Sequence, residues 1–343
     1  MKVLFGTFSA ATVLGGGVAV QVRALARELN RLGVEVDLFD PWKQYRLAQY
    51  DLFHLFAAHV GTYHLGRAIK TLGLRLAVTP TFFSRHSAGT LAAMVAVPGV
   101  IRRRGGFWTE QMFCKELCGM ADLVLPNTNA EAELVCGALG VPRSKIMVIP
   151  NGVDPRFARA TPDAFFNKYG IRDFLLYVGH IGWRRKNVAA LLRSIVGLPF
   201  RTVLVGKLID NEYGRLCGDM IRANAEVLHI PELQPESGLL ESTYAAAKVL
   251  VLPALYETPG LAALEAALAG ANVCITKNGG TTEYFGEYAT YLDPNSERNI
   301  RESVVAAMAR PKSESLRNHV RQNFLWGEAA SRLLEAYSVL SEQ

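Results

Sequence analysis

The sequence predicts an α/β fold made of two doubly wound domains. Strand patterns and helix patterns alternate along most of the chain, which favours parallel sheets joined by right-handed helical crossovers. The chain has 343 residues, which corresponds to about two domains at the usual ~150 residues each. Half of the residues are hydrophobic and 20% are charged, so we expect globular domains with sizeable cores.

The first half of the chain predicts a series of strands joined by helices. Residues 3–7 read as a buried strand that leads into a glycine-rich loop at 10–17 and a helix at 18–32. A helix is also expected at 128–139, with Thr128 or Asn129 as its cap. Further strands of this half are expected at 35–39, 52–55, 75–79, 123–126 and 146–149.

The strand and helix pattern starts again after Pro150. A strongly helical stretch at 261–269 follows one of the strands, and only helical patterns follow the last strand. We therefore predict a first domain at 1–153, a second domain at 154–323 and a C-terminal helix within 324–343. The strands of the second domain are expected at 174–178, 201–205, 226–229, 249–252, 272–275 and 290–292.

Charge and cysteine content narrow the class of protein. The net charge of +6 suits an anionic small molecule or a membrane surface, and no motif that reads DNA or RNA accompanies it. Five scattered cysteines show no zinc or disulfide spacing, which favours a reducing compartment. The longest apolar run, 91–101, is interrupted at Pro98-Gly99 and is shorter than the ~20 residues that span a bilayer. With no signal-peptide pattern at the N-terminus, we expect a cytoplasmic protein.

Two glutamates flank a Pro-Gly turn in the second domain. Glu257 follows a strand pattern, and Glu265 falls in the early turns of the helix that comes next. Open α/β sheets bind ligands at the carboxyl ends of their strands, and a helix start offers free N–H groups to a phosphate. Carboxylates on both sides of a phosphate suit the hydroxyl groups of a sugar and a ribose. The alternative is that Glu257 caps the turn and Glu265 is a solvated helix residue.

Three adjacent cations follow the first strand of the second domain. Arg184, Arg185 and Lys186 lie in a loop that is expected at the same edge of the sheet, so one or two of them can reach a diphosphate. The alternative is an ordinary solvated surface.

Five segments in consistent order resemble the motifs of retaining glycosyltransferases of family 4, also described as glycosyl transferases group 1. The segments are 149–154, 177–187, 257–265, 279–283 and 286–294, and the similarity covers nearly the whole chain. The resemblance implies the GT-B fold, in which two Rossmann-like domains hold a nucleotide-sugar in the cleft between them. It also implies a last helix that packs on the N-terminal domain.

The resemblance further implies a hexosyltransferase that takes its sugar from a nucleoside diphosphate such as UDP or GDP and needs no metal or permanently bound cofactor. Glu257 would hold the sugar hydroxyls, and Lys186 with Arg185 would stabilise the departing diphosphate. Retention is ascribed in such enzymes to attack on the face that the leaving group vacates, with a phosphate oxygen taking the acceptor proton. The expected donor-binding residues are Gly16, Gly17, His180, Arg184, Thr258, Pro259, Gly260, Leu261 and, at the ribose, Glu265.

His180 departs from the family pattern, in which an arginine commonly contacts the diphosphate. Either His180 takes part of that role, or Arg184 or Arg185 reaches in from the loop. A neutral histidine would donate one hydrogen bond but carry no charge.

The glycine run 15–17 opens a helix after the first strand, and such loops let the backbone approach a phosphate closely. The Gly-x-Gly-x-x-Gly spacing is missing, which makes an NAD-dependent dehydrogenase the poorer interpretation. The resemblance assigns Gly16 and Gly17 to the donor phosphate, while a plain flexible turn is the alternative.

The acceptor is the least defined part of the site. His86 is the candidate for a histidine that contacts sugar or acceptor, and a surface or core role is the alternative. The apolar run 91–101 beside Arg85, residues 102–104, Phe107 and Trp108 would suit a lipid-linked acceptor and peripheral contact with the inner face of the membrane. The same stretch also fits an ordinary helix packed on the first domain.

Two other functions share these motifs. A nucleotide-sugar epimerase of the same fold would use the same donor loops and would turn over without an acceptor. A non-catalytic relative would bind a nucleotide or a partner protein, and the departure at His180 favours it. The presence of Glu257, Glu265 and Lys186 together favours a transferase with a glycan, lipid-linked or small-molecule acceptor.

Overall fold

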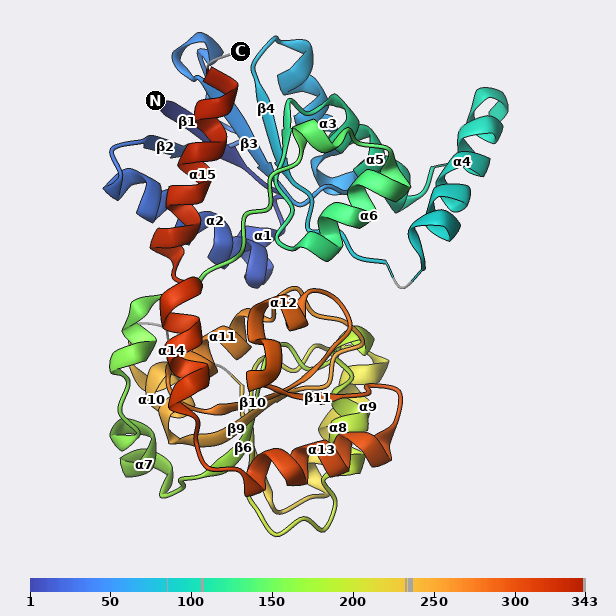
Figure 1. The fold of residues 1–343 in the computed structure, drawn as a ribbon. Coiled ribbons are helices and arrows are strands. Elements are labelled where there is room, and N and C mark those ends of the chain that lie inside the picture. Colours follow the sequence, from blue (N-terminus) through green and yellow to red (C-terminus); the bar gives the residue numbers. More distant parts are fainter. Residues whose placement is uncertain (85, 106–107, 232, 234–236, 342–343) are drawn as a thin grey trace. The chain divides into compact units, whose positions relative to one another are not determined.

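The computed structural model describes residues 1–84, 86–105, 108–231, 233 and 237–341. The chain forms two compact units (Figure 1). The first unit combines Met1–Gly152 with Trp326–Gln343, and the second unit is Val153–Leu325. Both contain a parallel sheet with alternating helices, so the predicted α/β class is confirmed.

The sheet of the first unit is parallel throughout and has the order β2-β1-β3-β4-β5. The chain steps outward on both sides of β1, which places the topological switch point between β1 and β3. β3 is buried at all five positions, as expected for a central parallel strand covered on both faces. The strands are Lys2–Gly6 (β1), Glu35–Leu38 (β2), Leu52–Phe56 (β3), Leu76–Thr79 (β4) and Leu123–Val124 (β5).

The helices of the first unit join its strands or pack on other helices. The predicted cap of one helix is confirmed, because the Thr128 side chain accepts a hydrogen bond from the Glu131 N–H at 3.0 Å. The helices are Ala11–Leu14 (α1), Gly17–Arg31 (α2), Val60–Thr71 (α3), Ala88–Gly105 (α4), Glu110–Met120 (α5), Asn129–Leu139 (α6) and Trp326–Ser341 (α15).

The last helix of the chain, α15, packs on α2 and belongs to the first unit. Its Tyr337 hydroxyl lies 2.6 Å from Nδ1 of His54, a fully buried residue of β3. His54 Nε2 lies 2.9 Å from the Thr79 hydroxyl. Arg75 adds a hydrogen bond to the backbone carbonyl of Leu340.

The predicted strand at 146–149 is wrong. This segment does run beside β5, and the Met147 N–H donates to the Val124 carbonyl at 3.0 Å. The next bond of a parallel ladder would come from the N–H of residue 126, but Pro126 has none. An isolated bridge between Val124 and Ile146 and a hydrogen bond from the Ile149 N–H to the Pro126 carbonyl at 2.9 Å remain, without a continuous ladder.

One other local prediction needs correction. The loop expected at 10–17 contains the short helix α1 before its glycines. Pro98-Gly99, which interrupts the apolar run 91–101, lies inside α4, because an internal proline removes one backbone hydrogen bond and can bend a helix without ending it. No helix within the described residues is both long and apolar enough to cross a membrane.

The second unit has a six-stranded parallel sheet with the order β11-β10-β9-β6-β7-β8. Its topological switch point lies between β6 and β9, where the chain changes the direction in which it adds strands. Each predicted strand of this half is present within two residues of its expected ends. The strands are Phe174–Val178 (β6), Thr202–Val205 (β7), Val227–Ile230 (β8), Ala247–Leu252 (β9), Asn272–Thr276 (β10) and Thr290–Leu292 (β11).

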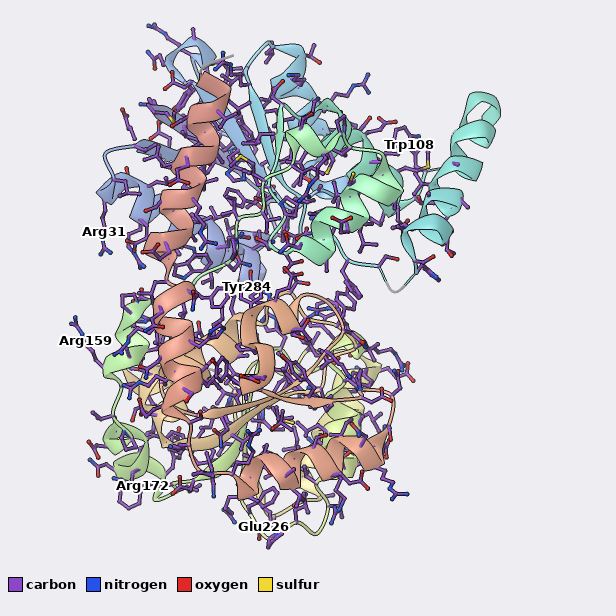
Figure 2. All side chains as sticks on the ribbon, viewed as in Figure 1. Arg31, Trp108, Arg159, Arg172, Glu226 and Tyr284 are labelled. Carbon is purple, nitrogen blue, oxygen red and sulfur yellow. The ribbon has the colours of Figure 1, made fainter. Side chains whose placement is uncertain are left out.

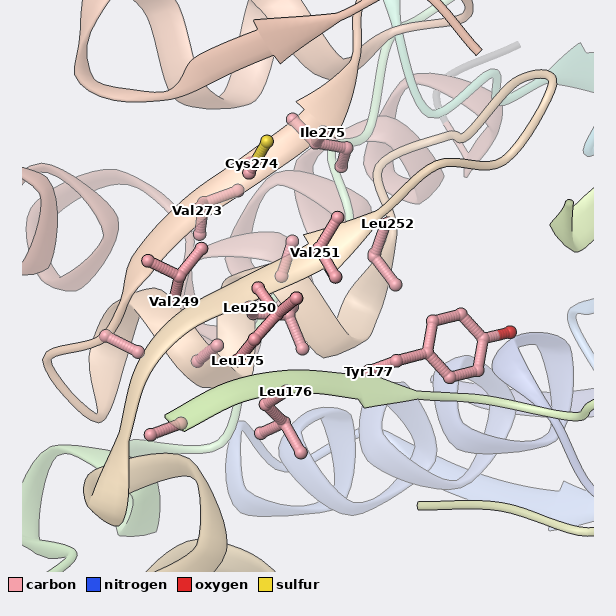
Figure 3. Packing of buried hydrophobic residues seen from close by; sticks show 14 of the residues in the cluster. Leu175, Leu176, Tyr177, Val249, Leu250, Val251, Leu252, Val273, Cys274 and Ile275 are labelled. Atoms are coloured by element: carbon pink, nitrogen blue, oxygen red, sulfur yellow. The ribbon is translucent and has the colours of Figure 1, made fainter. Parts of the chain in front are cut away.

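Buried apolar side chains hold the central strands of this sheet in place. Figure 3 shows Leu175 and Leu176 of β6 beside the valines and leucines of β9 and residues 273–275 of β10. Each large apolar side chain buried in this way contributes about 1.5–3 kcal/mol. The charged residues labelled in Figure 2, such as Arg172 and Glu226, project from the periphery of the unit and are exposed.

The helices of the second unit join its strands or follow the last one. Two short 3-10 helices also matter for the site: Pro155–Arg159 (η3) and Arg184–Lys186 (η4). The α-helices are Asp163–Tyr169 (α7), Val188–Ser194 (α8), Glu212–Arg222 (α9), Leu239–Ala246 (α10), Leu261–Leu268 (α11), Thr281–Phe285 (α12), Glu297–Ala309 (α13) and Glu314–Asn323 (α14).

Candidate functional site

The candidate site lies in the second unit, at the carboxyl ends of β6 and β9. These strands are direct neighbours in the sheet and flank its topological switch point. The loop after β6 carries Lys186, and the loop after β9 carries Glu257. Ligands of open α/β sheets bind at such a switch point because the loops diverge there.

Lys186 and Glu257 form an ion pair at this position. Lys186 Nζ lies 2.5 Å from Glu257 Oε1. The Glu257 side chain is only 7% exposed and that of Lys186 is 20% exposed, so the carboxylate has little access to water. A buried carboxylate needs a partner of opposite charge, and Lys186 supplies it.

The backbone around Glu257 is held by the loop that follows β10. The Glu257 N–H donates to the Asn278 carbonyl at 3.0 Å, and the Gly280 N–H donates to the Glu257 carbonyl at 3.1 Å. Gly279 lies between these contacts with φ +100°, and a Cβ there would come within 2.0 Å of the Glu257 carbonyl oxygen. Glycine is therefore required at this position.

Asn187 fixes the loop that carries Lys186. Its backbone is left-handed, with φ 57°. Its side-chain amide donates to the carbonyl of Pro253 at 3.1 Å and to that of Pro294 at 2.7 Å. One side chain thus ties the loop after β6 to the ends of β9 and β11.

The two arginines beside Lys186 differ in direction. Arg185 Nη1 donates to the Tyr256 carbonyl at 3.0 Å and lies 3.8 Å from Glu257 Oε1. Arg184 is 72% exposed, and its guanidinium lies against the ring of Tyr213. Arg185 therefore joins the Lys186–Glu257 pair, and Arg184 does not.

His180 lies in the same loop and is half-buried. Burial is the main cause that lowers the pKa of its imidazole, and the nearby charges of Lys186 and Lys207 lower it further. His180 is therefore neutral at pH 7 and can donate one hydrogen bond without adding charge. Its backbone carbonyl accepts from the Tyr177 hydroxyl at 3.2 Å.

The turn at 258–260 leads into α11. The peptide bond between Thr258 and Pro259 is cis, and Gly260 precedes the helix with φ 80°. Hydrogen bonding within the helix starts with the Ala263 N–H, which donates to the Gly260 carbonyl at 2.8 Å. Leu261 begins the helix, where the first N–H groups have no intrahelical acceptor.

Glu265 lies one turn further along α11 and is partly buried. Its Oε2 accepts a hydrogen bond from the Tyr244 hydroxyl at 2.6 Å. Burial raises the pKa of Glu265 to about 7, although the Tyr244 hydrogen bond and the charge of Arg156 both act to lower it.

The remaining predicted site residues belong to the first unit. Gly16 precedes α2 with φ 97°, Gly17 begins that helix, and both are exposed. His86 is also exposed, and its backbone N–H donates to the Ser84 hydroxyl at 3.1 Å. Of the expected acceptor region, Arg85, Phe107 and the side chains of 97–105 lie outside the described residues.

The second unit therefore brings together seven of the predicted residues around the ends of β6 and β9. They are His180, Arg185, Lys186, Glu257, Thr258, Pro259 and Gly260. This arrangement offers a paired cation, a second cation, a buried carboxylate and a helix start to one ligand. Within the described residues, no group of three or more histidine, cysteine, aspartate or glutamate side chains is arranged to hold a metal ion.

Sequence reasoning missed two residues that support the site. Asn187 and Tyr244 act through contacts with segments 66 and 21 residues away. The role of Asn187 could have been predicted in part from the sequence, because asparagine tolerates a left-handed backbone at the start of a helix. The contact of Tyr244 could not, since a tyrosine in an apolar helix is ordinarily a core residue.

Comparison with known proteins identifies the class that this fold and these loops define. Residues 41–157 match the family model described as Glycosyltransferase Family 4. Residues 162–324 match the model described as Glycosyl transferases group 1, and this match contains both Lys186 and Glu257. The chain belongs to the GT-B glycosyltransferases of the family 4 type.

Curated relatives share about a quarter of their residues with this chain. A D-inositol 3-phosphate glycosyltransferase from Stackebrandtia nassauensis is 26% identical over 74% of this chain and 62% of its own length. The chain thus spans less than two thirds of that relative. A glycosyltransferase from Methanocaldococcus jannaschii, described as uncharacterized, is 24% identical over 100% of this chain and 99% of its own.

Solved structures share the fold along their whole length. Sucrose-phosphate synthase from Thermosynechococcus elongatus superposes with a TM-score of 0.79 at 20% identity, covering 100% of this chain and 99% of its own. HepE from Anabaena, crystallised with UDP-glucose, superposes with a TM-score of 0.72 at 16% identity, covering 100% of both chains.

Proposed function

We propose that the protein is a retaining hexosyltransferase that moves a sugar from a nucleoside diphosphate sugar to an acceptor and needs no metal ion. The observation that carries this proposal is the Lys186–Glu257 pair at the switch point of the second sheet. It combines a cation for a diphosphate with a buried acceptor for sugar hydroxyls, inside the segment that matches Glycosyl transferases group 1.

Lys186 contacts both Glu257 and the donor diphosphate in the proposed reaction. An ammonium group has three N–H donors, so it can keep one bond to Glu257 and turn others toward the diphosphate. Negative charge builds on the departing phosphate in the transition state, and a fixed cation then stabilises it more than in the ground state. Arg185, with its guanidinium 3.8 Å from Glu257, is the second cation in reach.

Glu257 holds the transferred sugar in this proposal. Its carboxylate is fixed by Lys186 and by the backbone contacts with the loop after β10, so hydroxyl groups of the sugar meet a pre-oriented acceptor. The acceptor attacks the face that the leaving group vacates, and a phosphate oxygen takes the acceptor proton. No protein side chain acts as the base.

The donor and acceptor classes rest on what similar proteins bind. HepE was solved with UDP-glucose, and the catalytic domain of starch synthase IV from Arabidopsis thaliana, with 14% identity and a TM-score of 0.72, was solved bound to ADP and acarbose. We infer a nucleoside diphosphate sugar as donor. A glycan, a lipid-linked sugar or a small molecule serves as acceptor, and the D-inositol 3-phosphate transferases favour a phosphorylated one.

The test is acceptor-dependent release of nucleoside diphosphate. The protein is incubated with EDTA and UDP-glucose, GDP-mannose or ADP-glucose, each with and without inositol 3-phosphate and a set of lipid-linked sugars. We expect release that requires an acceptor, persists in EDTA and falls about 100-fold or more in Lys186→Ala and Glu257→Gln. The anomeric coupling of the product, measured by NMR, should match that of the donor.

A non-catalytic nucleotide-binding relative is the second candidate, and the neutral state of His180 favours it because one cation of the usual pair is then missing. Nucleotide binding without turnover on any acceptor would support it. Rapid donor conversion without an acceptor would instead point to an epimerase.

We also propose a cytoplasmic location. All five cysteines are free, which is typical of proteins in a reducing compartment.

A further inference from the structure

Tyr244 and Glu265 form a side-chain pair that connects α10 to α11. Tyr244 is fully buried, and its hydroxyl donates to Glu265 Oε2 at 2.6 Å. The ring packs edge-on against Phe157 of η3, with ring centroids 5.6 Å apart. The packing against Phe157 restrains the Tyr244 ring, and the hydrogen bond to Glu265 restrains its hydroxyl, so the hydroxyl has little freedom to move.

The two oxygens of Glu265 differ in their hydrogen bonding. Oε2 is occupied by Tyr244, whereas no described residue donates a hydrogen bond to Oε1. The hydrogen bond to Oε2 orients the carboxylate, and Oε1 keeps its capacity to accept further hydrogen bonds. The open oxygen can accept hydroxyl groups from a ligand in a fixed direction.

Charged and titratable groups surround this pair on several elements. Glu241 comes from α10, Arg156 comes from η3, and Asp154 caps η3. Arg317 of α14 contacts the far end of α11 at the Leu268 carbonyl. β9 and β10 contribute apolar core residues. Burial raises the pKa of Glu265 first of all, while the Tyr244 hydrogen bond lowers it and Glu241 and Asp154 raise it.

We propose that Tyr244 is a positioning residue for the ribose of the donor: its hydroxyl holds Glu265 Oε2 so that Oε1 accepts the ribose 2′-hydroxyl. This inference rests on the proposed function, because it takes a ribonucleotide as the ligand of this site. Burial raises the pKa of Tyr244 itself well above its ordinary value, so the hydroxyl stays a donor at every pH at which the protein is studied.

The test compares each ribonucleotide with its 2′-deoxy analogue. The dissociation constants of UDP and dUDP, GDP and dGDP, and ADP and dADP are measured by calorimetry from pH 6 to pH 9. The ratio of the two constants reports the 2′-hydroxyl contact. Ionisation of the terminal phosphate cancels in this ratio, because both nucleotides of a pair share it.

The variants are Tyr244→Phe and the matched control Tyr337→Phe. Each removes a fully buried tyrosine hydroxyl that lies 2.6 Å from a side-chain partner, but Tyr337 belongs to the first unit and contacts His54. A purely structural effect of losing such a hydroxyl appears in the melting temperature of both variants. It leaves the ratio of dissociation constants unchanged.

In the wild type we expect the ribonucleotide to bind about 10–100-fold more tightly than its deoxy analogue at pH 8, as for a hydrogen bond to a charged group. Tyr244→Phe should bring this ratio near one at pH 7. It should also move the midpoint of the ratio's rise to higher pH, because the pKa of Glu265 rises when the hydrogen bond that lowers it is lost. Tyr337→Phe should keep the wild-type ratio and its pH profile.

An unchanged ratio and pH profile in Tyr244→Phe, with nucleotide binding intact, would overturn this inference alone. A ratio of one in the wild type would overturn it as well, because Glu265 would not contact the 2′-hydroxyl. Failure of every nucleoside diphosphate to bind the wild type would overturn the proposed function, and the inference with it.

Discussion

Asn187 is the residue on which the position of Lys186 depends most directly. It follows Lys186, holds a left-handed backbone conformation, and its amide bonds two carbonyls from other loops. The sequence predicted Lys186 as a functional cation from its place after a strand. It did not predict what holds Lys186, because those contacts join residues 66 and 107 positions apart.

Substitutions at Asn187 separate the two contributions of this side chain. Asn187→Gly keeps the left-handed backbone and loses both hydrogen bonds, which should cost about 1–2 kcal/mol of unfolding free energy. Asn187→Ala loses the bonds and also strains the backbone, so we expect about 1 kcal/mol more. Urea unfolding measures both. Equal stability of the two variants would show that backbone strain plays no part here.

At the scale of elements, the strands of the second sheet were the most predictable part of the fold. β6 is a continuous apolar run, and so is β9 from Val249 to Leu252; such runs are typical of parallel strands buried on both faces. The segment at 146–149 has the same composition but is not a strand, because its neighbour Pro126 cannot donate the next ladder hydrogen bond. The composition of a segment therefore predicts that it is buried, whereas its pairing in a sheet also depends on the residues of the neighbouring segment.

The loop after β10 is the element that holds Glu257. Gly279→Ala places a Cβ 2.0 Å from the Glu257 carbonyl oxygen, so the backbone must move. We expect a loss of about 3 kcal/mol or more in unfolding free energy, in the range of severe core and backbone mutations, and loss of donor binding. Urea unfolding and nucleotide titration measure these effects.

Gly270→Ala is the matched control for this prediction. Gly270 follows α11 with φ 95°, close to the φ of Gly279, but nothing lies within 4 Å of the added Cβ. It should cost only the backbone strain, about 1–2 kcal/mol, and leave nucleotide binding unchanged. Equal losses of stability and equal nucleotide binding in the two glycine variants would show that the loop after β10 does not hold Glu257.

At the scale of the molecule, the C-terminal helix completes the first unit. His54 in β3 meets Tyr337 in α15 across 283 positions of sequence. The resemblance to family 4 implied that the last helix packs on the N-terminal domain, whereas its amphipathic pattern alone could not tell which surface it covers. Nor could the pattern reveal that a neutral histidine lies in the contact.

This contact makes the stability of the first unit depend on pH. Burial lowers the pKa of His54 to about 3, so the folded unit keeps the histidine neutral while the unfolded chain takes up a proton below its ordinary pKa of about 6.5. The free energy of unfolding should therefore fall as the pH is lowered from about 6.5 to 3, by up to ~1.4 kcal/mol per pH unit.

The comparison of His54→Gln with His64→Gln checks this pH dependence by urea unfolding at pH 7, 6 and 5. His64 is exposed, so its variant should keep the wild-type slope. His54→Gln should be less stable at pH 7 but should lose less stability on acidification. A wild-type slope in His54→Gln would show that another group causes the acid sensitivity.

The most direct test of the central claim is a thermal-shift measurement with UDP, GDP, ADP, dTDP and NAD, in magnesium and in EDTA. A ligand that binds only the folded protein raises its melting temperature. The test variant is Lys186→Ala, and the control is Lys312→Ala. In the wild type, Lys312 Nζ donates to the Ala245 carbonyl at 2.9 Å. We predict that at least one nucleoside diphosphate stabilises the wild type and Lys312→Ala equally with and without metal, and stabilises Lys186→Ala much less. No shift with any diphosphate, or a shift with NAD alone, would contradict the account.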